Sequence, residues 1–95
     1  MTNIMRQDIF NRTVDEMETN MVIIARAYYD TCTHLVNAFN RSVTLSLRKQ
    51  ETIKASVALT QLCAVAPNSV KKGLSTSYLE ERVRDAYKFN RMRPD

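Results

Sequence analysis

The first 66 residues of this 95-residue chain contain neither glycine nor proline. Pro67 is the first residue of either kind, Gly73 is the only glycine, and Pro94 is the only other proline. Tight turns depend on these residues, because glycine reaches positive φ at little cost and proline fixes φ. The sequence therefore predicts an all-α fold of a few long helices, in a single domain over residues 1–95.

Apolar side chains recur at every third or fourth position through the front of the chain, which is the spacing of one helical face. The residues in this stripe are Phe10, Val14, Met17, Met21, Ile24, Tyr28, Cys32, Leu35 and Phe39. They predict a long N-terminal helix over about residues 13–40. Thr13 and Glu16 match a capping box, which places the helix start near Thr13. An earlier start within residues 3–11 stays open.

The middle of this helix is apolar on every side, because residues 21–25 read Met-Val-Ile-Ile-Ala. A helix that is apolar all round is normally covered all round. A helix of about 28 residues also spans about 42 Å, whereas a compact chain of this size is about 32 Å across. The helix must therefore project, bend or be covered by a partner. We expect a helical homo-oligomer, most simply a homodimer, with contacts from Met21, Val22, Ile23 and Tyr28.

Residues 40–51 allow three interpretations. Val43 to Leu47 alternate between apolar and polar residues, as in a half-buried strand. Such a strand would need a partner from a second chain. The alternatives, which we favour, are a continuation of the first helix to about residues 48–50 or a new helix capped by Ser42.

The rest of the chain predicts two further helices joined by a short turn. The first covers about residues 51–66 and ends before Pro67; its expected buried residues are Ala55, Leu59, Leu62 and Ala66, widened by Val57, Ala58 and Val65. A short turn over residues 68–74 follows. A last helix over about residues 78–90 is introduced by a capping box at Ser77 and Glu80. It carries Leu79, Val83, Ala86 and Tyr87 on one face, with Asn90 as a further candidate for that face. We expect these two helices to lie end to end along the first.

The two parts of the chain differ in charge. Residues 1–40 hold three arginines and five carboxylates (+3 and −5, or −2), whereas residues 41–95 hold eleven lysines and arginines and five carboxylates (+11 and −5, or +6). An acidic front and a basic back suit head-to-tail self-association. The basic part also suits an acidic protein or nucleic acid.

The chain lacks the residue patterns of enzymes. His34 is the only histidine, and its neighbour Cys32 is two positions away, which places the two on different faces of a helix. We expect a solvated His34, and reduced thiols at Cys32 and Cys63. One glycine cannot form a phosphate-binding loop, and the few cysteine and histidine residues do not form a metal site. We expect no catalytic residues, no metal and no cofactor.

No apolar run approaches the roughly 20 residues of a membrane-spanning helix, and the polar N-terminus does not resemble a signal peptide. We therefore expect no membrane partner. The expected location is the cytoplasm, or the host cytoplasm for a viral protein.

The stretch from Leu59 to Leu74 loosely resembles a helix-turn-helix. Aliphatic residues at positions 59, 62, 65 and 70 match the spacing of that motif. The resemblance implies a second helix that begins near Asn68 and Ser69, with Lys71 and Lys72 facing phosphate. Ala64 stands where the motif usually has glycine, Thr60 where it prefers alanine, and Gly73 interrupts the second helix.

A basic C-terminal stretch supports the same interpretation. It contains Arg82, Arg84, Lys88 and Arg91, with Tyr87 and Phe89 between them. Basic and aromatic residues together can hold a phosphate backbone and stack on bases. Tyr87 also follows Val83 on the apolar face, which favours a structural role for this ring.

The sequence thus leads to two hypotheses. The first is a small non-enzymatic protein that binds a protein partner through helix packing. Such a protein would act as an accessory protein, an inhibitor or an assembly factor, of the type that viruses and phages encode. The alternative is a helix-turn-helix-like transcriptional regulator that binds DNA.

Overall fold

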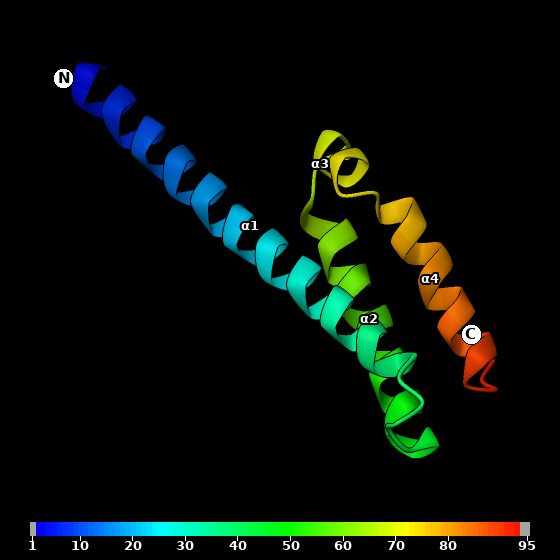
Figure 1. Cartoon of the computed structure of the whole chain (residues 1–95). Coiled ribbons are helices and arrows are strands. Elements are labelled where there is room, and N and C mark those ends of the chain that lie inside the picture. The colour runs from blue at the N-terminus through cyan, green and yellow to red at the C-terminus, as the bar shows by residue number, and fades with distance from the viewer. Residues whose placement is uncertain (1, 94–95) are drawn as a thin grey trace.

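The computed structural model describes the backbone of residues 2–93 and the side chains of residues 8–93. This part of the chain forms helices and no strand, so the predicted all-α fold is confirmed (Figure 1). The helices are α1 (Thr2–Ala38), α2 (Leu45–Val65), α3 (Asn68–Gly73) and α4 (Thr76–Phe89).

Helix α1 has the earlier of the two starts that the sequence left open. It begins at Thr2, and the predicted cap at Thr13 lies inside it. The Thr13 hydroxyl donates a hydrogen bond to the carbonyl oxygen of Ile9, one turn earlier, at 2.9 Å. No glycine or proline interrupts residues 2–12. The helix therefore meets no residue of low helix propensity that would end it before Thr13.

The long helix projects from the rest of the molecule. Its 37 residues span about 55 Å, and the molecule measures 62 × 21 × 20 Å. The radius of gyration is 17.6 Å, compared with about 12 Å for a compact chain of this length. Figure 1 shows α1 as a straight rod whose N-terminal half extends past the other helices. Projection, one of the outcomes that the sequence allowed for this helix, is therefore observed in the single chain.

Helix α2 begins six residues before the predicted start at Glu51. Thr44 is its N-cap, and the Thr44 hydroxyl accepts a hydrogen bond from the amide of Leu47 at 3.4 Å. Residues 45–47 are therefore the first turn of a helix, and the alternating pattern there does not form a strand. A new helix was one of the favoured interpretations, although Thr44 rather than Ser42 caps it. The end before Pro67 is as predicted.

Helix α4 begins two residues before the predicted start at Tyr78. Its N-cap is Ser75, which has a left-handed backbone (φ 55°) and makes no capping bond with its side chain. Ser77 and Glu80 therefore lie inside the helix and do not form the predicted capping box.

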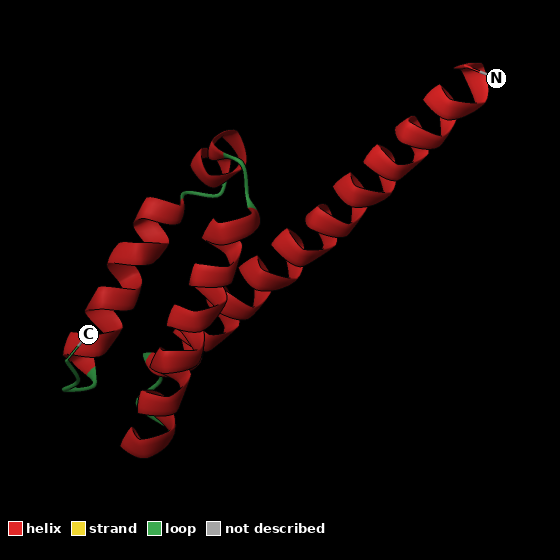
Figure 2. Cartoon of the chain, turned by 180° about the vertical axis from the view of Figure 1, so that it is seen from behind, coloured by secondary structure: helices red, strands yellow, loops and turns green. Residues whose placement is uncertain are grey.

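The helices fold back on one another, so the expected end-to-end arrangement of the two later helices is wrong. Helix α2 runs back along the C-terminal half of α1, and α4 then runs back along α2 (Figure 2). The short α3 provides the reversal between them. A side-by-side arrangement lets α2 bury residues toward both neighbours, which an end-to-end row would not allow.

The core lies where these three helices meet. Its buried apolar members are Ala27, Leu35 and Ala38 from α1, Ala55, Leu59 and Leu62 from α2, Ala66, and Leu79, Val83 and Ala86 from α4. Ala55, Ala58, Leu59, Leu62 and Ala66 are buried as predicted, whereas Val65 is only half-buried and Val57 is not buried. Val57 is 64% exposed, because it lies on the side of α2 that faces neither neighbour.

A buried polar cluster joins the ends of three helices. The amide of Asn90 donates to the carbonyl oxygen of Ala38 at 2.9 Å and to the hydroxyl of Thr52 at 3.0 Å. Its carbonyl oxygen accepts from Nε of Arg48 at 3.0 Å. Close by, the rings of Phe39 and Phe89 lie 5.4 Å apart. These contacts hold the C-terminal ends of α1 and α4 against α2 and leave the N-terminal half of α1 without such support.

Candidate functional site

The C-terminal half of α1 buries one face against the rest of the chain. Ala27, Thr31, Leu35 and Ala38 are at most 7% exposed, and they follow one another at steps of three or four residues. The hydroxyl of the buried Thr31 has a hydrogen-bond partner, because it donates to the carbonyl oxygen of Ala27 at 2.7 Å. We call these four residues the covered face. One turn earlier, Ile24 is half-buried against the core. Packing within the chain thus involves α1 from about Ile24 to Ala38, which is less than half of the helix.

A second apolar face runs along α1 on a side that the other described helices leave largely uncovered, although its Cys32 packs partly against the core. Its members also follow steps of three or four residues, and so lie in one line along the helix. They are Val14, Glu18, Met21, Ala25, Tyr29, Cys32 and Val36. We call this line the open face. Met21, Tyr29 and Val36 are 65%, 67% and 68% exposed.

More apolar side chains flank the open face. Phe10 and Met17 lie on one edge with Tyr28, and Val22 lies on the other edge. All four are exposed, Phe10 and Val22 as strongly as Met21. An uncovered apolar surface of this extent usually marks a site of contact with another molecule.

The charges of α1 gather away from the open face, with Glu18 as the exception. Between residues 8 and 30 the helix has two arginines and five carboxylates (+2 and −5, or −3). Arg12 pairs with Asp8 at 3.0 Å and Arg26 with Asp30 at 3.6 Å. Asp15, Glu16 and Glu18 form no ion pair with any residue that the structure describes. The projecting half of α1 is therefore apolar along one side and acidic along another.

The structure brings together three of the four residues predicted for self-association. Met21 is on the open face, and Val22 and Tyr28 lie at its edges. Ile23 is half-buried and points to the other side of α1, because it lies two positions from Met21. Tyr29 and Val36 were missed, although Val22, Tyr29 and Val36 recur at every seventh position. A search for a second stripe in the sequence would have found them.

The first four residues predicted for nucleic-acid binding lie together on α3. Asn68, Lys71 and Lys72 line a shallow groove at the junction of α3 and α4, and the exposed Ser69 lies next to them. Helix α3 has six residues and so spans about 9 Å. A recognition helix enters the major groove with several residues, and α3 offers fewer than two turns.

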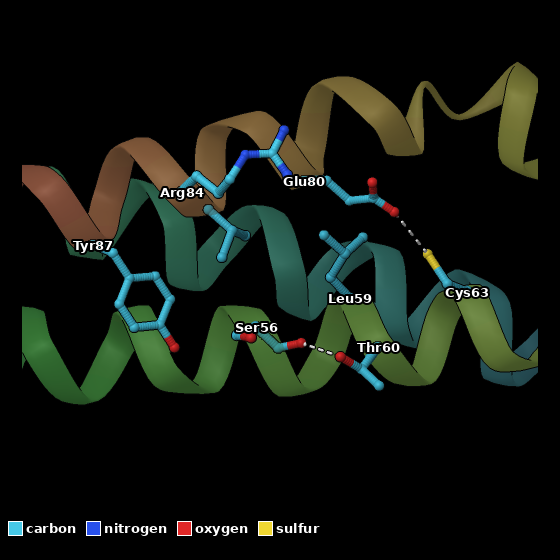
Figure 3. A pocket seen from close by; sticks show the side chains of 8 residues that line it. Ser56, Leu59, Thr60, Cys63, Glu80, Arg84 and Tyr87 are labelled. Atoms are coloured by element: carbon cyan, nitrogen blue, oxygen red, sulfur yellow. Dashed lines mark hydrogen bonds between the residues drawn. The ribbon is translucent and has the colours of Figure 1, made fainter. Parts of the chain in front are cut away.

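The basic residues at the end of the chain do not all lie on one surface, although Arg84 and Lys88 are one turn apart on α4. The Arg82 guanidinium carbon lies 4.4 Å from the centroid of the Phe39 ring, and a guanidinium nitrogen bonds Asp85 at 3.1 Å. Arg84 lines a groove toward α2 (Figure 3). Lys88 and Arg91 are exposed near the far end of α4, at the opposite end of that helix from α3.

The groove in Figure 3 lies between α2 and α4 and has a volume of about 360 Å³. Its most nucleophilic residue type is the thiol of Cys63, whose Sγ is 3.9 Å from Oε1 of Glu80. Burial raises the pKa of the Cys63 thiol, and the Glu80 carboxylate raises it further. Both effects favour the neutral thiol, which is a weak nucleophile. The lining residues thus do not activate Cys63 for catalysis.

His34 has a structural partner, so the expectation of a solvated histidine is wrong. Its Nδ1 lies 2.6 Å from Oε2 of Glu51, and Asn37 donates to the other oxygen of that carboxylate at 3.0 Å. These contacts join α1 to the first turns of α2. Cys32 lies instead beside Tyr28 and raises the pKa of the Tyr28 phenol.

No protein family, curated protein or solved structure matches this chain. Within residues 2–93, no helix combines the length and the apolar character that crossing a membrane requires. The same residues contain no cluster of three or more histidine, cysteine or acidic side chains suited to a metal ion.

Proposed function

We propose that this protein is a small non-enzymatic binding protein that contacts another macromolecule by helix packing along the open face of α1. The observation that carries the proposal is the two-thirds exposure of Met21, Tyr29 and Val36 on one line of a projecting helix. Exposed apolar groups in such a line lose unfavourable contact with water when a second helix covers them.

The residue types on the open face suit a protein partner. Tyr29 combines a large apolar ring with a polar hydroxyl, and residues of this kind often contribute most of the binding free energy at protein interfaces. Met21 adapts its shape to irregular neighbours. The acidic flank of α1 adds a preference for a partner with basic residues beside its apolar contacts. These features fit an accessory protein, an inhibitor or an assembly factor.

The proposal can be tested with a photo-crosslinking amino acid placed at Val36, in the cells that produce the protein. Val57 is the matched control, because it is also a valine and is 64% exposed, compared with 68% for Val36. It differs from Val36 in its position, since it lies on the outer side of α2. We expect a discrete crosslinked species from position 36 and none from position 57. Absence of a crosslink at position 36, or equal crosslinking at both, would contradict the proposal.

A further inference from the structure

We infer that the partner of the open face is a second copy of this chain, packed antiparallel to the first with the two-fold axis at Ala25. This inference rests on the proposed function and names its partner. Four observations lead to it: the order of the residues along the open face, the sizes of those residues, the charge distribution, and the extent of the exposed apolar surface.

The open face has matching positions on either side of Ala25. Met21 and Tyr29 lie four residues before and after it, and Val14 and Val36 lie eleven residues before and after it. A two-fold axis at Ala25 therefore places Met21 against the partner's Tyr29 and Val14 against the partner's Val36. Such an interface uses the same surface of both copies, which is the common form of a homodimer.

The residue sizes fit this arrangement. Ala25 is exposed and is the smallest residue of the open face, and a small residue at the point of contact lets two helices approach to about 8 Å. Met21 and Tyr29, on either side, are long enough to fill the space between the two backbones. The centre of the contact would thus be closely packed without a cavity at the axis.

Charge favours the antiparallel orientation over the parallel one. Residues 8–30 of α1 have a net charge of −3 (+2 and −5), while residues 41–95 have +6 (+11 and −5). An antiparallel pair brings the acidic half of each α1 beside the basic part of the other copy, with Asp8 at about the level of the partner's Arg41. A parallel pair would place acidic half beside acidic half, and like charges in contact oppose association.

The exposed apolar surface is large enough for a specific dimer. The open face and its edges expose seven large apolar side chains: Phe10, Met17, Met21, Val22, Tyr28, Tyr29 and Val36. At about 100 Å² each they offer about 700 Å² per copy, close to the roughly 800 Å² per partner of a stable interface. Val14, Ala25 and Cys32 would add to this.

The oligomeric state gives the first test. Analytical ultracentrifugation should show a wild-type dimer, a dimer for the control Val57→Asp, and a Kd at least about tenfold higher for Val36→Asp. Circular dichroism checks that both variants keep their helix content. If Val36→Asp loses helix, Val36→Ser replaces it and should weaken the dimer in the same direction. A wild-type protein that is monomeric at about 100 µM would overturn the inference.

Glu18 provides a variant with the opposite effect. In the proposed pair this carboxylate lies against the partner's Cys32, in partly apolar surroundings, where it loses hydration. Glu18→Ala should therefore lower the Kd of the dimer by about threefold to tenfold. The control Glu16→Ala, which lies away from the open face and removes one charge of the acidic flank, should leave the Kd unchanged or raise it slightly. A Glu18→Ala variant that weakens the dimer would contradict this interface.

Cysteine crosslinking tests the orientation, in a chain whose own Cys32 and Cys63 are replaced by serine. A mixture of Val14→Cys and Val36→Cys chains should be joined by a short bismaleimide into a heterodimer. Val36→Cys chains alone should not crosslink, because their cysteines lie at opposite ends of the pair. Crosslinking of Val36→Cys chains to one another would indicate a parallel pair and overturn the inference.

These results separate this inference from the proposed function. A monomer whose position 36 crosslinks to another protein in cells would overturn the homodimer and leave the proposed function standing. A monomer that crosslinks to nothing at position 36 would remove both.

Discussion

The side-chain amide of Asn90 donates a hydrogen bond to the carbonyl oxygen of Ala38 at 2.9 Å, and so joins the last residue of α1 to the C-cap of α4. Asn90 is fully buried and also bonds Thr52 and Arg48 of α2. This one side chain therefore fixes the end of the molecule from which α1 projects.

Replacing Asn90 by alanine should destabilise the fold strongly. The change removes one hydrogen-bond partner from each of three groups: the carbonyl oxygen of Ala38, the hydroxyl of Thr52 and Nε of Arg48. We therefore expect the free energy of unfolding to fall by about 2–4 kcal/mol. Urea denaturation followed by circular dichroism measures this. Asn68→Ala, at an exposed position, should change the free energy by no more than about 0.5 kcal/mol. Equal effects of the two changes would show that the Asn90 bonds contribute little.

Glycine at position 91 should stabilise the protein. Arg91 has φ 57°, and its amide donates to the carbonyl oxygen of Lys88 while the amide of Met92 donates to that of Tyr87. This is the Schellman arrangement, in which glycine usually takes the left-handed position. Arg91→Gly should therefore raise the free energy of unfolding by about 0.5–1 kcal/mol. Arg93→Gly is the control, and an equal gain there would refute the backbone explanation.

The reactivity of Cys63 should depend on Glu80. Burial and the Glu80 carboxylate raise the pKa of the thiol, so Glu80→Gln should lower that pKa and increase the thiolate fraction at pH 8. We expect alkylation of Cys63 by iodoacetamide to become about twofold to fivefold faster, measured by mass spectrometry. Glu81→Gln is the control and should leave the rate unchanged. A slower reaction in Glu80→Gln would contradict the assigned effect.

The same raised pKa has a consequence for stability. The pKa of the Cys63 thiol is higher in the folded protein than in the unfolded chain. The neutral thiol therefore stabilises the folded state fully at pH values below the unfolded pKa, and this stabilisation is lost as the pH rises through the folded pKa. The free energy of unfolding of the wild type should therefore fall slightly more than that of Glu80→Gln at alkaline pH.

DNA binding should be weak and without sequence preference. A titration of duplex DNA with micromolar protein at about 50 mM salt separates the two functional hypotheses, because phosphate contacts weaken steeply as salt rises. Helix α3 is short and the basic residues of α4 point to different sides, so we expect no complex that depends on Lys71 and Lys72. Tight binding that Lys71→Gln and Lys72→Gln abolish would favour the DNA-binding hypothesis.

Local patterns in the sequence determined the helices and most of their buried faces. The absence of glycine and proline before Pro67 is a local constraint on the backbone, so the long helices and the end of α2 were predictable. Ala55, Leu59 and Leu62 were predicted as buried and are buried, because their spacing lies within one helix. The starts were harder to predict. Thr13 and Ser77 both match a capping pattern, but the same residues are tolerated inside a helix, as the bond from Thr13 to Ile9 shows.

For this chain, then, the sequence alone determined that α1 is long and that its apolar residues exceed what one face requires. Only the tertiary structure decided which of them are covered, because that depends on where α2 and α4 lie. The structure buries Ala27 and Leu35 and leaves Met21 and Tyr29 in contact with solvent. The helical periodicity of the sequence indicates the direction in which each apolar side chain of α1 points. Burial also requires a second surface packed against that side chain. Helices α2 and α4 provide such a surface only along the C-terminal half of α1.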